Sequence, residues 1–166
     1  MKPYLNSGTK ALSAVISRSN SETARQLDHQ LSQVNSSLHR SIALGAESAV
    51  RGELTDVYLE CSEANWDGYN ALPIDPDSFA LAKAFLMALP FGTRTPSAGA
   101  HPDGQMSLEW YSGPRRSLTI SFDPVGDLHF AALTGPSRAC GTEAFDTEAF
   151  CSEVPQILLE LIELVS

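Results

Sequence analysis

The chain has 166 residues, of which 43% are hydrophobic, and its formal net charge is −9. This length suits one domain, and the apolar content can form a core without disulfide support. The charge is unevenly divided, because residues 1–51 have a net charge of +3 and residues 52–166 a net charge of −12. The acidic part repels phosphate, which argues against direct nucleic-acid binding. It suits either a basic protein partner or simple solubility.

The cysteines Cys61, Cys140 and Cys151 form no C-x-x-C pair and are odd in number. A structural zinc site needs four ligands at characteristic spacings, which this sequence lacks. We therefore expect reduced, mostly buried thiols and neither a metal nor another cofactor. The chain also lacks the apolar run of a signal peptide and the ~18 apolar residues of a membrane span. These features predict a cytoplasmic protein without membrane contact.

The first 45 residues are expected to differ from the rest of the chain. Residues 1–20 are polar and rich in serine, which predicts a flexible N-terminus. A helical arm follows over residues 21–45, and its apolar residues recur every three or four positions as a narrow seam. The seam consists of Ala24 and the larger residues Leu27, Leu31, Val34 and Leu38. Such a helix either lies along its own domain or uses these four residues to bind a partner or to form a homodimer.

Residues 46–166 are expected to form a single α+β domain that begins with two helices. The first helix has a broad apolar stripe, formed by Val50, Leu54, Val57, Tyr58 and Cys61. The second helix has Asp75 as a natural N-cap and Pro76 at its first position. Its predicted inner stripe consists of Phe79, Ala82, Leu86 and Leu89. Pro90 then ends the helix, because proline cannot continue the hydrogen-bond ladder.

Alternating apolar and polar residues then predict three antiparallel strands, over residues 106–111, 117–122 and 128–132. Residues 96–101 are a candidate edge strand, and residues 135–142 are expected to be a loop. A last helix begins at Asp146 or Thr147, within which Pro155 either causes a kink or marks the true first turn. The predicted fold is therefore a three- to four-stranded antiparallel sheet with helices packed on one face, plus the N-terminal arm.

Two motifs stand out within this domain: Asn65-Trp66-Asp67-Gly68-Tyr69, and a later Asp103-Gly104 followed by Leu108-Glu109-Trp110. Together they resemble a family of short uncharacterised bacterial proteins that pair a W-D-G motif with a later strand ending in E-W. The resemblance covers about residues 60–133 and implies no activity and no catalytic residue. Asn70 stands where the family pattern has glycine, so the chain departs from the pattern in that turn.

The first motif has two interpretations. Trp66, Asp67 and Tyr69 can form a recognition loop, because tryptophan and tyrosine are common anchors of protein interfaces. Alternatively they are structural: Trp66 caps the core, Asp67 and Gly68 make the turn, and Tyr69 covers the sheet edge. The sequence leaves both interpretations open and favours the structural one.

Catalytic signatures are weak. Asp67, Glu109 and His101 could serve a small hydrolase if the fold brought them together, since acid–base catalysis needs groups within hydrogen-bond reach of a substrate. His101 with Asp103, or His129 with Asp127, could bind a metal, although solvated positions suit them better. Neither a G-x-S-x-G elbow nor a phosphate-binding glycine loop is present in the sequence.

These observations favour a non-enzymatic protein-binding module of the antitoxin, immunity or inhibitor type. In this hypothesis the protein covers its partner, with the N-terminal seam in contact and the acidic body facing a basic surface. The alternatives are the small hydrolase and an acidic mimic of nucleic acid.

Overall fold

The computed structural model describes residues 25, 29, 30, 32, 33, 45, 47–146 and 153–166. The chain divides into two compact units, Met1–Ile42 and Ala43–Ser166. The described residues of the first unit are helical and exposed. The predicted flexible segment of residues 1–20 lies outside the described residues, as do the seam residues Leu27, Leu31, Val34 and Leu38.

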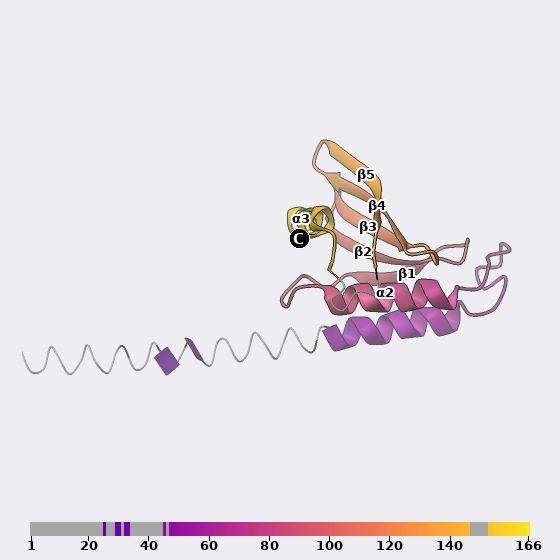
Figure 1. Cartoon of the computed structure of the whole chain (residues 1–166), viewed down its shortest axis with the longest axis horizontal. Coiled ribbons are helices and arrows are strands. Elements are labelled where there is room, and N and C mark those ends of the chain that lie inside the picture. Colours follow the sequence, from indigo (N-terminus) through magenta and orange to yellow (C-terminus); the bar gives the residue numbers. More distant parts are fainter. Residues whose placement is uncertain (1–24, 26–28, 31, 34–44, 46, 147–152) are drawn as a thin grey trace, which may run out of the picture. The chain divides into compact units, whose positions relative to one another are not determined.

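The second unit contains a five-stranded antiparallel sheet in which each strand pairs with its neighbours in the sequence (Figure 1). Its strands are β1 (Ser97–Ala100), β2 (Met106–Gly113), β3 (Arg116–Phe122), β4 (Asp127–Thr134) and β5 (Ser137–Ala144). The α+β class is confirmed, and the described sheet has five strands rather than three or four. The loop predicted over residues 135–142 was wrong, because β5 occupies most of it. Nearly all of β5 is exposed, so its sequence lacks the apolar alternation by which a half-buried strand is recognised.

One face of the sheet forms the core, and α2 (Pro76–Ala88) and α3 (Gln156–Val165) both pack on it (Figure 1). Leu108, Ile120 and Phe130 are opposite one another in the register of β2, β3 and β4 and lie on this face. Trp110 is 1% exposed, and its indole N–H donates to the carbonyl oxygen of Arg94 at 2.7 Å. The predicted period-two pattern therefore identified the buried face of these strands.

Residues 47–60 form a helix that lies beside α2 (Figure 1). Its predicted stripe is confirmed, since Val50, Leu54 and Cys61 are buried. On α2, Phe79 stacks on Tyr58 of this helix with ring centroids 4.3 Å apart, while Phe85 is fully buried in the core. The helix α2 therefore has two covered sides, whereas the sequence predicted a single inner stripe.

Asp75 caps α2 as predicted, because its Oδ1 accepts from the backbone N–H of Asp77 at 2.8 Å. Helix α3 begins at Gln156 with Pro155 in the N-cap position. The predicted start at Asp146 or Thr147 was therefore wrong, and the alternative in which Pro155 marks the first turn is confirmed. Residues 147–152 lie outside the described residues. None of the described helices has the length and apolar character that crossing a membrane requires.

Candidate functional site

The two motifs of the sequence meet in space at one end of the sheet. The backbone N–H of Leu72 donates to the carbonyl oxygen of Pro102 at 2.8 Å, and that of Asp75 donates to Gly104 at 2.9 Å. Residues 61–75 therefore lie against the turn of residues 101–105, which joins β1 to β2. We call residues 61–75 the motif loop.

Hydrogen bonds from two side chains fix the centre of the motif loop. Oδ1 of Asp67 accepts from the backbone N–H of Tyr69 at 2.7 Å and from that of Ala71 at 3.1 Å. Oδ1 of Asn65 accepts from the N–H of Asn70 at 2.8 Å. Asn65 and Asn70 have φ of 65° and 78°, a left-handed conformation that asparagine tolerates better than most residues. Asn70 therefore replaces the expected glycine without losing the turn.

The two aromatic residues of the motif loop have opposite environments. Trp66 is partly buried against the core, and its indole N–H donates to the carbonyl oxygen of Leu72 at 2.9 Å. Tyr69 is 90% exposed and Leu72 is 57% exposed. The structural roles predicted for Trp66 and for the Asp67–Gly68 turn are confirmed. The expectation that Tyr69 covers the sheet edge was wrong, since Tyr69 points into solvent.

The end of the sheet that carries the motif loop is acidic. The turn of residues 123–127 lies beside that of residues 101–105, because Gln105 Nε2 donates to Asp123 Oδ2 at 3.4 Å. Together with the motif loop, these turns contain no lysine or arginine and six carboxylates: Glu63, Asp67, Asp75, Asp103, Asp123 and Asp127. We call these three segments the acidic end. Val125, on the 123–127 turn, is 83% exposed and is, with Leu72, an exposed aliphatic side chain of the acidic end.

The residues proposed for a hydrolase do not form a hydrogen-bonded set. The carboxylate of Asp67 accepts hydrogen bonds from the backbone of its own loop, and Glu109 is exposed on the open face of β2. His101 Nε2 lies 3.1 Å from Ser121 Oγ. Within the described residues, no hydrogen bond or ion pair joins any two of Asp67, Glu109 and His101.

The histidines take partners that the sequence did not indicate. His129 Nδ1 lies 2.9 Å from Thr142 Oγ1, and its Nε2 lies 3.6 Å from a carboxylate oxygen of Asp123 rather than of Asp127. His101 contacts Ser121, and Ser121 is directly opposite His129 in the register of β3 and β4. The imidazoles of His101 and His129 therefore lie on the same open face of the sheet. Recognising this required the hairpin register, which places residues 121 and 129 together. The described residues contain no group of three or more histidine, cysteine, aspartate or glutamate side chains suited to a metal ion.

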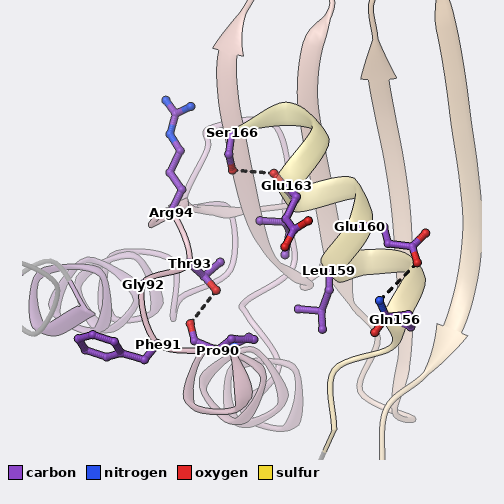
Figure 2. A pocket seen from close by; sticks show the side chains of 11 residues that line it. Pro90, Phe91, Gly92, Thr93, Arg94, Gln156, Leu159, Glu160, Glu163 and Ser166 are labelled. Carbon is purple, nitrogen blue, oxygen red and sulfur yellow. Dashed lines mark hydrogen bonds between the residues drawn. The ribbon is translucent and has the colours of Figure 1, made fainter. Parts of the chain in front are cut away.

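A hollow of about 420 Å³ lies between the 90–94 segment and α3 (Figure 2), and no residue of the motif loop lines it. Leu159 and Phe91 provide apolar surface, and Glu160 and Glu163 are its acidic side chains. Arg94 points away from α3 in Figure 2; its guanidinium donates to Ser112 Oγ and, at 3.1 Å, to the carbonyl oxygen of Tyr111. None of Asp67, His101 and Glu109 lines this hollow.

The chain matches no protein-family model, and it shows no significant similarity to a curated protein or to a solved structure. The resemblance based on the W-D-G and E-W motifs stays a prediction.

Proposed function

We propose that the protein is a non-enzymatic binding module that inhibits a partner protein by covering it, as antitoxins and immunity proteins do. The observation that carries the proposal is Tyr69, which is 90% exposed on a loop held by hydrogen bonds from Asp67 and Asn65. Because these bonds hold the backbone of the loop, little backbone entropy is lost on binding, and the exposed ring offers a large amphipathic surface. Such residues are frequent hot spots of protein interfaces.

The charge around Tyr69 specifies the kind of partner. The acidic end carries six carboxylates and no lysine or arginine, so a basic protein surface would be attracted to it. Leu72 and Val125, 57% and 83% exposed, supply further apolar contact area at this end. Apolar contacts would then provide affinity, and the carboxylates would speed the encounter.

The N-terminal seam is proposed as a second contact. Leu27, Leu31, Val34 and Leu38 lie outside the described residues, so this part of the proposal is supported by their sequence spacing alone. Charged substitutions at Leu27 and Leu31 are expected to weaken partner binding. If both substitutions leave binding and oligomeric state unchanged, the seam has no such role.

The test is affinity capture from a bacterial lysate with three forms of the tagged full-length chain: wild type, Tyr69→Ala and Tyr111→Ala. Tyr111 is a matched control, since it is also exposed, at 58%, but lies on β2. We expect a stoichiometric basic protein with the wild type and with Tyr111→Ala, lost with Tyr69→Ala and weakened by salt. Equal capture by all three forms, or no partner at all, would contradict the proposal.

The carboxylates of the acidic end also support a second candidate, in which they imitate the phosphates of a nucleic acid. The same experiment separates the two candidates when a duplex oligonucleotide is added to the washed complex. Release of the partner by the oligonucleotide would favour nucleic-acid mimicry. If the partner stays bound when the oligonucleotide is added at constant salt, the protein binds a site on the partner that does not bind nucleic acid.

A further inference from the structure

The two edge strands of the sheet, β1 and β5, differ in how well they are protected against pairing with another strand. Edge strand β1 has four residues and follows Pro96, and the backbone N–H of Ala98 donates to Glu53 Oε1 at 3.0 Å. A short strand, an adjacent proline and a side chain that takes up an outward N–H are all features that prevent edge-to-edge pairing. The β1 edge is thus protected.

Edge strand β5 lacks two of these protections within the described residues: it is not short, and no side chain takes up its outward backbone groups, although Pro136 directly precedes it as Pro96 precedes β1. It is eight residues long, seven of them exposed and the eighth half-buried, and it contains no proline. Its four central residues, 139–142, carry no charge. Proteins rarely leave such a strand unpaired, because its free N–H and C=O groups can recruit another strand.

The hydrogen-bond alternation identifies the outward groups of β5. The N–H of Phe145 donates to the carbonyl oxygen of Gly126 at 3.0 Å, so the odd-numbered residues of β5 bond to β4. The even-numbered residues direct their N–H and C=O groups away from the sheet: Arg138, Cys140, Thr142 and Ala144. No side chain among the described residues donates to or accepts from these four backbone positions.

We propose that β5 pairs antiparallel with β5 of a second copy, so that the two sheets join across a two-fold axis near Gly141. This register places Cys140 opposite Thr142 and Arg138 opposite Ala144, and all four outward residues of each strand are paired. A two-fold interface of this kind is self-complementary and closes at two copies. This dimer proposal does not rest on the binding role of Tyr69, which belongs to the motif loop and not to β5.

Charge favours the second copy, in the antiparallel direction, as the occupant. Arg138 lies at the beginning of β5, whereas Glu143 and Asp146 lie at or just after its end. Antiparallel pairing brings the Arg138 end of one strand next to the Glu143 end of the other, so opposite charges lie near each other at both ends of the joined strands. Parallel pairing would instead place like charges side by side.

The test is sedimentation velocity of the full-length chain over a range of concentrations, for wild type, Cys140→Pro and Cys140→Ala. Proline removes the outward N–H of residue 140 and leaves the bonds to β4, so the strand can persist at an edge. Cys140→Ala keeps that N–H and controls for loss of the thiol. We expect the wild type and Cys140→Ala to dimerise alike, and the dissociation constant of Cys140→Pro to rise at least about tenfold.

Hydrogen exchange of the wild type gives a measurement that needs no variant. The amides of Cys140 and Thr142 should exchange slowly at concentrations where the dimer forms and quickly where it dissociates. A wild type that stays monomeric would overturn the proposal, as would fast exchange of these amides in a dimer. Dimerisation that survives Cys140→Pro but is lost with Leu31→Glu would assign association to the N-terminal seam instead.

Discussion

Gly104 lies directly against Pro73, so that a Cβ added at Gly104 would stand 2.9 Å from the carbonyl oxygen of Pro73. Gly104 also has a φ of 92°, which side chains other than glycine's rarely allow. The contact joins the motif loop to the second sequence motif, since Pro73 belongs to the motif loop and Gly104 to the Asp103–Gly104 pair. One glycine thus permits the close packing of the motif loop on the 101–105 turn.

We expect Gly104→Ala to lower the free energy of unfolding by more than the ~1–3 kcal/mol of backbone strain alone, because the new methyl group meets an immobile backbone atom. Gly92→Ala is the matched control: Gly92 has a φ of 87°, and nothing lies within 4 Å of its added Cβ. The difference between the two variants in urea denaturation measures the close approach. Equal losses would show that the loop can move away from residue 104 at no cost.

Ser78 connects α2 to the sheet through a single buried hydroxyl. Its Oγ donates to the carbonyl oxygen of Phe122 at 2.6 Å and accepts from the N–H of Met106 at 2.8 Å. Ser78→Ala leaves both backbone groups without a partner in the core, so we expect a loss of about 1–3 kcal/mol in the free energy of unfolding. Ser62→Ala, which removes an exposed hydroxyl bonded to Leu59, should cost much less in the same denaturation experiment. A similar small loss in both variants would mean that water replaces Ser78 within the core.

The fold class and the N-cap of α2 were predictable because local sequence patterns determine them. Alternation identified the buried residues of β2 to β4, and Asp75 with Pro76 identified the start of α2. Strand β5 was missed for a physical reason: a strand exposed on both faces has no apolar period to recognise. Ser78 gave no signal either, since a serine in a helix is usually exposed, and only the tertiary packing buries it.

The candidate site was predictable only in part. The sequence identified Trp66, Asp67 and Tyr69 but favoured the interpretation in which Tyr69 covers the sheet edge, whereas the structure exposes it. The difference arises because a loop closed by side-chain hydrogen bonds has no periodicity that reveals which residue points outward. The packing of residues 61–75 on residues 101–105 is a long-range contact, which the spacing of motifs in the sequence does not encode.

The rigidity of the motif loop depends on the carboxylate of Asp67. Asp67→Ala removes the acceptor of two backbone N–H groups, so we expect the amides of Tyr69 and Ala71 to exchange faster with deuterium. The cost in the free energy of unfolding should be about 1 kcal/mol, as for other local side-chain caps. Asp67→Asn keeps a carbonyl oxygen at this position and should preserve most of the protection. Unchanged exchange in Asp67→Ala would show that Asn65 and the backbone bonds suffice to hold the loop.

Cys61 gives a pH-dependent test of the core. Burial raises the pKa of the Cys61 thiol, and the carboxylate of Glu60 adds a smaller effect in the same direction. Between the ordinary thiol pKa and the raised one, the folded protein retains a proton that the unfolded chain releases. The stability from this group is therefore complete below the ordinary thiol pKa and is lost as the pH rises through the folded value. Urea denaturation at neutral pH and about one unit above the ordinary thiol pKa should show a larger loss for wild type than for Cys61→Ala. Cys140→Ala is the control, because Cys140, unlike Cys61, is exposed, and this variant should behave as wild type. Equal pH dependence in wild type and Cys61→Ala would mean that the thiol titrates as freely in the folded protein as in the unfolded chain.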